Sequence, residues 1–326
     1  MLTHDDEHYD SEQSNDAGQA AEPSALTRRS LRVLIRRVPV RAGLLVLLAL
    51  AAGLGGGFLL GRKYPAATVA ERVKSSLPES FTLPVSYGKI GPALLAAGAI
   101  DQERFVQLYA DAGRPLTEGQ LAALTDGSDA SIVIDKQSAH FLLNLFWALG
   151  LTNRNAILQT GPMARYGEEK IGGFASTAGW TLGTKPATSL YASVPIVELT
   201  AEQQTLVERV ASAVYRPCCG NATLFPDCNH GMAMLGILEL MASQGASEDD
   251  MLTAAKYVNA FWFPQQTLEL ATFLRATQGV DLAKADARLV VGKELFSAQG
   301  FQAVHQELIT DGLLPQAPGG GNSCGV

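Results

Sequence analysis

The chain has 326 residues, of which 47% are hydrophobic and only 17% are charged, and its formal net charge is −7. This length is sufficient for one or two folded domains, and so apolar a composition excludes a wholly disordered or coiled-coil protein. An acidic chain also lacks the basic surface that releases counterions from phosphates, so we expect no nucleic-acid partner.

Charge is segregated at the N-terminus. Residues 1–27 hold seven acidic and no basic residues, which predicts a disordered acidic tail. Residues 28–41 then hold six arginines, and residues 42–61 form an uncharged stretch of 20 apolar and glycine residues. At about 1.5 Å per residue, a helix of that length crosses the hydrocarbon core of a bilayer. Because positive flanks stay inside, we predict a single-pass transmembrane helix with a cytoplasmic N-terminus and a C-terminal domain outside the cytoplasm, at the cell membrane.

Two other features of this region bear on topology and partners. Arg28 and Arg29 resemble a twin-arginine export signal, but Arg62 and Lys63 follow the apolar stretch where small residues would precede a cleavage site. The uncleaved helix through residues 42–61 is therefore the expected contact with the lipid bilayer. Glycines recur at every fourth position from residue 53 to residue 61, a spacing that allows close helix approach and predicts a face for a homodimer or another protein partner.

Beyond the predicted helix we expect three regions. Residues 62–85 are expected to form a stalk, residues 86–315 a helical extracytoplasmic domain, and residues 316–326 a glycine-rich tail that carries Cys324. The periodicity of the domain is mostly that of amphipathic helices, and strand signals are few. The predicted fold class is therefore all-α, a helical bundle with glycine- and proline-rich loops.

Helix starts can be read from local signals. Three segments begin with a hydroxyl residue and carry Gln or Asp three positions later, which is the capping-box spacing. These pairs are Thr117 with Gln120, Thr200 with Gln203, and Ser247 with Asp250.

Further signals place the remaining helices. Asp135 is expected to cap a helix with an apolar stripe over residues 141–149, and Pro264 to occupy the first turn of a helix that ends near residue 277. A last helix is expected over residues 298–310. Residues 161–185 are expected to form a loop, and residues 189–199 show some strand character.

Three cysteines and one histidine gather in one loop. Cys218 and Cys219 follow a predicted helix, and Cys228 and His230 stand at the start of the next one. Asn229 is expected to cap this second helix, so Cys228 lies just outside its N-terminus, where the helix dipole lowers a thiol pKa. We therefore expect the three thiols and the imidazole to lie close together, because all four belong to one short segment of the chain.

A soft-metal site is the leading interpretation of this loop. Three thiols and one imidazole suffice for tetrahedral zinc or for thiolate-bound copper(I), and a following thioether adds a soft ligand. Outside the cytoplasm such ligands favour copper first and zinc second, in a protein that binds or handles the metal. The predicted metal ligands are Cys218, Cys219, Cys228, His230, Met232 and Cys324.

Two alternatives stay open. An even number of cysteines outside the cytoplasm is typical of disulfides, here Cys219–Cys228 with Cys218–Cys324 or the converse pairing. Such bridges predict a non-enzymatic scaffold that binds a protein partner at the membrane surface, through residues 161–185 or the transmembrane glycine face. Thiol exchange is the other alternative, although the chain has no CxxC motif. Because no known catalytic motif is present, we do not predict an enzyme.

Overall fold

The computed structural model describes Val73 and residues 77–314, all within one compact unit. The predicted tail, basic segment and membrane span over residues 1–61 lie outside the described residues, as does Cys324. Within the described part, no helix combines the length and the apolar character that crossing a bilayer requires.

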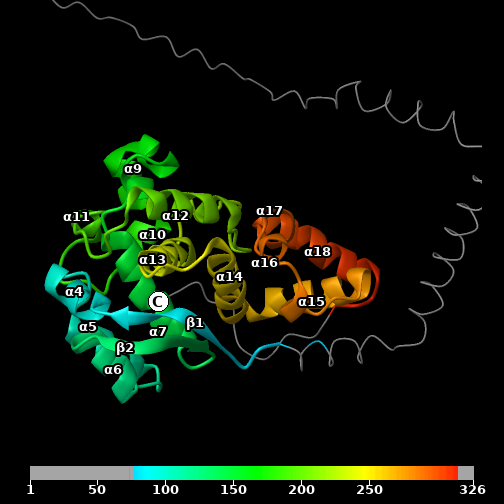
Figure 1. The fold of residues 1–326 in the computed structure, drawn as a ribbon, viewed down its shortest axis with the longest axis horizontal. Helices are drawn as coiled ribbons and strands as arrows, with labels where there is room; N and C mark the ends of the chain where they lie inside the picture. Colours follow the sequence, from blue (N-terminus) through cyan, green and yellow to red (C-terminus); the bar gives the residue numbers. More distant parts are fainter. Residues whose placement is uncertain (1–72, 74–76, 315–326) are drawn as a thin grey trace, which may run out of the picture. The chain divides into compact units, whose positions relative to one another are not determined.

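The described chain is mostly helical, as expected, and Figure 1 shows α12 and α13 above the strands, with α14 between this group and α15–α18 at the right. The longer helices are α4 (Ile90–Ala97), α5 (Gln102–Asp111), α6 (Glu118–Thr125), α7 (Ala139–Thr152), α12 (Ala201–Ala213), α13 (Asn229–Ser243), α14 (Glu248–Trp262), α15 (Pro264–Gln278) and α18 (Ala298–Thr310). The short helices are α8 (Ala156–Gln159), η2 (Pro162–Tyr166), α9 (Gly167–Gly173), α10 (Ala175–Ala178), α11 (Ala187–Leu190), η3 (Leu282–Lys284), α16 (Ala287–Val290) and α17 (Lys293–Phe296).

The fold also contains a small sheet that the expected all-α class leaves out. Strand β1 (Ser80–Gly88) pairs antiparallel with β2 (Ser128–Asp135), and the register is irregular between Thr82 and Gly88. Leu83 and Val85 alternate with exposed residues, so one face of β1 is buried. The folded region therefore begins before the expected boundary at residue 86, because part of the expected stalk is this strand.

Local signals placed most helix starts correctly. All three capping boxes form, at the starts of α6, α12 and α14. Pro264 occupies the first turn of α15, and α18 has the expected bounds. Asp135 does not cap α7. Its carboxylate accepts hydrogen bonds from the backbone N–H groups of Gln137 and Ser138, at 2.8 and 2.7 Å, in the turn that follows β2.

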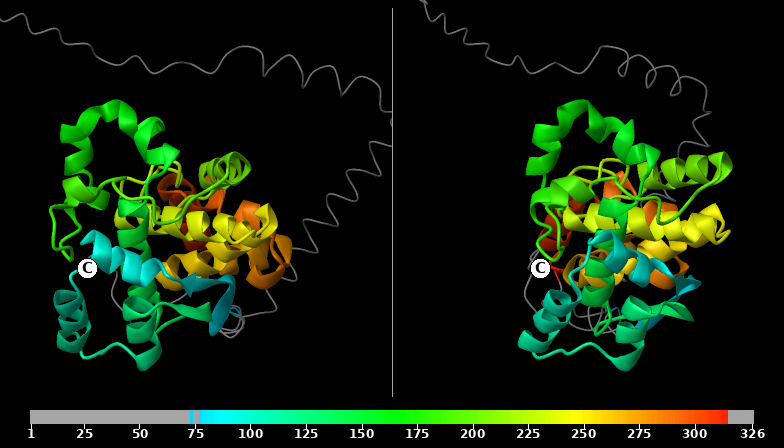
Figure 2. Two further views of the ribbon diagram at one scale, coloured as in Figure 1. Left: turned by 60° about the vertical axis from the view of Figure 1, so that its left-hand side comes forward. Right: turned by 90° about the vertical axis from the view of Figure 1, so that its left-hand side faces the viewer.

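Two expected irregular segments also differ from expectation. Residues 161–185 are not an open loop but contain η2, α9 and α10, which Figure 2 shows in green as an arch at the edge of the body. Residues 189–199 form no strand. Val194 makes an isolated β-bridge with Asn153. Pro195 lies beside that bridge and cannot donate to a ladder, which explains why no strand extends from it.

The centre of the fold is the contact between α7 and α13. Both helices are buried on nearly every side, as is typical of helices in the middle of a core. A Cβ on Gly150 would lie against the carbonyl oxygen of Met232, and a Cβ on Gly236 would lie 2.6 Å from that of Phe146. These two glycines therefore allow the helix backbones to touch.

The core divides into two hydrophobic clusters. The main cluster surrounds α7 and α13 and includes buried residues from Leu83 to Val258. The C-terminal cluster includes Phe263, which immediately precedes α15, Phe296 from α17 and Leu308 from α18. Trp262 packs against both clusters, so it marks the boundary between them.

A buried polar network joins α7, α13 and the segment after α11. The Asn153 side chain donates to the Val197 carbonyl oxygen and to Glu239, and it accepts from the N–H groups of Ile196 and Val197. Glu239 is fully buried, and burial raises its pKa well above the usual range, against the effect of the Asn153 hydrogen bond. Burial therefore favours the neutral form of this acid within the core.

The helix contact predicts that Gly150→Ala and Gly236→Ala each destabilise the fold by about 1–3 kcal/mol, because the new methyl group forces the backbones apart. Gly119→Ala is the matched control, since a Cβ at this exposed helical glycine meets nothing within 4 Å. We expect that control to change stability by less than about 1 kcal/mol, towards greater stability. Urea unfolding measures all three, and equal stabilities would contradict the proposed contact.

The buried acid predicts a pH-dependent stability. Because the folded chain raises the pKa of Glu239, the stability that this group contributes is present below the ordinary carboxyl pKa of about 4.3 and is lost as the pH rises towards the folded-state value. Glu239→Gln should therefore gain stability relative to the unsubstituted chain as the pH rises. Urea unfolding across this range measures the gain, and Glu307→Gln, on the exposed face of α18, should show none.

Candidate metal centre

The loop between α12 and α13 carries the cysteines and is held from three directions. It folds back on the end of α12, where the Thr223 N–H donates to the Val214 carbonyl oxygen at 2.8 Å. The Cys219 carbonyl oxygen accepts from the first N–H of α18, at 2.9 Å, and the Asp227 carbonyl oxygen accepts from Ser176 in α10, at 3.0 Å. The loop is therefore fixed against helices from both hydrophobic clusters.

The start of α13 brings Cys228 and His230 together. Cys228, and not the expected Asn229, is the capping residue, because its sulfur accepts from the Gly231 N–H at 3.4 Å. His230 follows in the first turn and is only 5% exposed. Its ring packs against Phe263 at 4.5 Å and Trp262 at 5.6 Å between centroids, which places it at the boundary between the two clusters.

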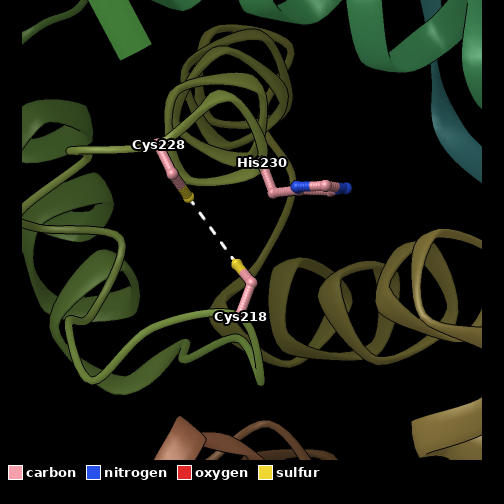
Figure 3. A group of neighbouring side chains, drawn as sticks. All are labelled: Cys218, Cys228 and His230. Atoms are coloured by element: carbon pink, nitrogen blue, oxygen red, sulfur yellow. Dashed lines mark hydrogen bonds between the residues drawn. The ribbon is translucent and has the colours of Figure 1, made fainter. Parts of the chain in front are cut away.

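Cys218, Cys228 and His230 form the first group of ligand atoms. One atom from each lies within 4.8 Å of the other two. Figure 3 shows the thiols of Cys218 and Cys228 pointing towards each other, with His230 projecting beside them from α13, and the two sulfur atoms are 3.7 Å apart. The Nδ1 atom of His230 is buried and accepts or donates no hydrogen bond within the described part of the chain. The described residues therefore leave the Nδ1 atom of His230 available to coordinate a ligand.

Cys219, Asp227 and Cys228 form a second group, also with ligand atoms within 4.8 Å of one another. The guanidinium of Arg216 already lies here. Its Nη2 donates to Asp227 Oδ1 at 2.7 Å and its Nε donates to Cys228 Sγ at 2.9 Å. The two groups share Cys228, so Arg216 contacts two members of the second group and one member of the first.

Arg216 is itself unusual, because only 2% of its side chain is exposed. Besides the two contacts just described, it donates to the carbonyl oxygens of Asn221 and Phe225, at 3.1 and 3.2 Å. A Cβ on Gly231 would lie 2.5 Å from the guanidinium carbon. Glycine at this position therefore makes room for the arginine against the first turn of α13.

The three thiols differ electrostatically. Hydrogen bonds from Cys218 and Cys219 lower the pKa of Cys228, and the nearby Arg216 charge and the Gly231 N–H lower it further, against the effect of burial. The hydrogen bonds that Cys218 donates to its two thiol neighbours raise its own pKa. Burial lowers the pKa of His230 to about 4, so this imidazole is neutral and able to act as a ligand at physiological pH.

The structure brings together only part of the predicted ligand set. Cys218, Cys228 and His230 meet, whereas Cys219 faces Asp227 and the Asn221 carbonyl oxygen, each 3.9 Å from its sulfur. Met232 is fully buried in the main hydrophobic cluster. The three described cysteines are free thiols.

Sequence reasoning did not single out Arg216, Asp227 or Gly231. Arg216 is in the loop but looks like an ordinary surface residue in the sequence, and its burial depends on carbonyl groups that converge only in the fold. A weak signal was available, because Arg216, Asp227 and Gly231 all lie within three residues of a cysteine.

No protein-family model, curated protein or solved structure matches this chain.

The electrostatics predict that Cys228 is the first of the three thiols to ionise as the pH rises. Because its pKa is depressed, its alkylation rate in metal-free protein should reach a plateau at lower pH than the rates of Cys218 and Cys219. Iodoacetamide labelling from about pH 5 to about pH 10, a range that brackets the ordinary thiol pKa, followed by peptide mass spectrometry, measures this order. In denaturant the three profiles should coincide, and coincident profiles in the folded protein would contradict the assignment.

Proposed function

We propose that this protein binds or handles a soft metal ion at Cys218, Cys228 and His230, outside the cytoplasm and anchored to the membrane. The observation that carries the proposal is the convergence of these three ligand atoms within 4.8 Å of one another. The buried Nδ1 atom of His230 supports it, because this atom has no hydrogen-bond partner among the described residues. A buried polar atom without a partner costs free energy, and a ligand position explains why it is present.

The sulfur separation fits one shared ion. Thiolates bound to the same ion at about 2.3 Å lie roughly 3.7–4.0 Å apart, depending on whether the ion is tetrahedral or trigonal. The Cys218 and Cys228 sulfur atoms are 3.7 Å apart. The pair could therefore accept an ion with little movement of the backbone.

Copper(I) is the first choice of metal and zinc the second. Two thiolates and one imidazole make a soft, three-member set, which suits copper(I). Structural zinc takes a fourth ligand, for which Cys219 and Cys324 are the remaining thiols of the chain. The guanidinium of Arg216 stabilises the thiolate form of Cys228, which is the form that binds a metal ion.

The proposed location depends on residues outside the described part of the chain. The apolar stretch over residues 42–61 and the arginines before it support a single span with the N-terminus in the cytoplasm. In that location the glycine face of the span is the proposed contact for a second copy of the chain or for another membrane protein.

A disulfide-stabilised scaffold is the second candidate function. The same short distance between the Cys218 and Cys228 sulfur atoms favours it, because two thiols so close together can be oxidised to a bridge in an oxidising compartment. That bridge would use two of the three proposed ligands. The metal site and the bridge are therefore mutually exclusive states of the same residues.

The metal proposal predicts that the full-length chain, purified in mild detergent under reducing conditions, binds copper(I) or zinc at Cys218, Cys228 and His230. Cys218→Ser, Cys228→Ser and His230→Phe should each reduce metal content more than tenfold, since each removes one ligand. The phenylalanine keeps an aromatic ring against Phe263, and His305→Phe is the matched control at a histidine on α18.

Elemental analysis and thiol titration of the same samples give the measurement. Competition between copper(I) and zinc then identifies the preferred ion. A metal-free protein with a Cys218–Cys228 bridge under non-reducing conditions would reject the metal proposal and support the scaffold.

A further inference from the structure

The two ligand groups share Cys228 and raise the question of how many ions the centre holds. A thiolate can bridge two metal ions, so Cys218 with His230 on one side of Cys228 and Cys219 with Asp227 on the other could in principle form a two-ion cluster. The sequence offers no means of distinguishing one ion from two.

The position of Arg216 distinguishes them. Its guanidinium nitrogens lie 2.9 Å from the Cys228 sulfur and 2.7 Å from the Asp227 carboxylate, which are two of the three members of the second group. A metal ion bound to the same atoms would be displaced by this group or would face its positive charge at very short range. Of the first group, the guanidinium contacts only the shared Cys228, because its remaining hydrogen bonds go to Asp227 and to the carbonyl oxygens of Asn221 and Phe225.

We infer that Arg216 is an internal cation that occupies the second group and thereby limits the centre to a single metal ion at Cys218, Cys228 and His230. This inference rests on the proposed function and concerns the specificity of the same site. The guanidinium cannot swing away easily, because its Nη1 also donates to the Asn221 carbonyl oxygen and its Nη2 to that of Phe225. Gly231 also leaves it the space that it fills.

Arg216 thus acts through charge and position without contacting the metal ion. It pairs with Asp227, which would otherwise attract a cation, and it donates to the shared sulfur of Cys228. Cys219 remains outside the ion's coordination sphere, although it is adjacent in sequence to a ligand. The centre therefore uses two of its three described thiols.

Stoichiometry tests this inference. Copper(I) is titrated anaerobically into the reduced full-length chain against the chelator bicinchoninate, in a Cys324→Ser background that excludes the thiol of the tail. We expect one ion per chain. Two ions in the unsubstituted loop would overturn the inference while leaving the proposed function intact, whereas no bound ion would contradict the proposed function itself.

Arg216→Met removes the charge and the donors but keeps an extended side chain. We expect its copper(I) stoichiometry to rise from one to two, whereas Arg216→Lys, which keeps a positive charge, should bind one. Arg209→Met is the matched control, because Arg209 pairs with Glu248 on the surface, away from the loop. A folded Arg216→Met protein that binds one ion would overturn the inference.

A further variant keeps the test decisive if Arg216→Met does not fold, as judged by circular dichroism. Cys219→Ser should leave the stoichiometry at one and the affinity within about twofold, since this thiol is outside the coordination sphere. Cys218→Ser should remove the ion. Loss of the ion in Cys219→Ser would show that the second group takes part in binding and would contradict the role assigned to Arg216.

Discussion

The close crossing of α7 and α13 is the constraint on which the candidate centre depends. Because Gly150 and Gly236 let the two backbones touch, α13 is held in the core along almost its whole length. A helix packed this tightly cannot slide or rotate without opening the core. Its first turn is therefore a rigid support, and the positions of Cys228 and His230 are fixed before any ligand arrives, which is the preorganisation that a metal centre needs.

The centre also lies where the two hydrophobic clusters meet. The His230 ring packs on Trp262, which contacts both clusters, and on Phe263, which belongs to the C-terminal one. The cysteine loop accepts a hydrogen bond from the start of α18 in the same region. An ion bound only by the folded chain would stabilise it, and here that stabilisation would act on the packing between the clusters as well as on the loop.

Features that depend on a few neighbouring residues could be predicted from the sequence, and features that depend on distant ones could not. The capping boxes, such as Thr200 with Gln203, and the gathering of three cysteines in one loop are local. The sheet is not, because β1 and β2 are separated by three helices and alternate over only a few residues. Within the site, the capping role of Cys228 and the burial of Arg216 depend on where α13 packs, which no local pattern encodes.

Arg216 is the most informative residue of the site, because removing a guanidinium from water costs free energy. An apolar side chain of similar volume is often neutral or favourable in place of a buried ion pair, so stability alone does not account for a cation here. This one is satisfied by a carboxylate, a thiol and two carbonyl oxygens, while His230 next to it keeps a buried nitrogen without a partner. Neighbouring features that each cost stability, such as this buried cation and this buried nitrogen, are expected at functional sites. The adjacent thiols therefore differ in their surroundings, since Cys218 belongs to the group that contains His230 and Cys219 to the group that contains Asp227, with which the arginine is paired.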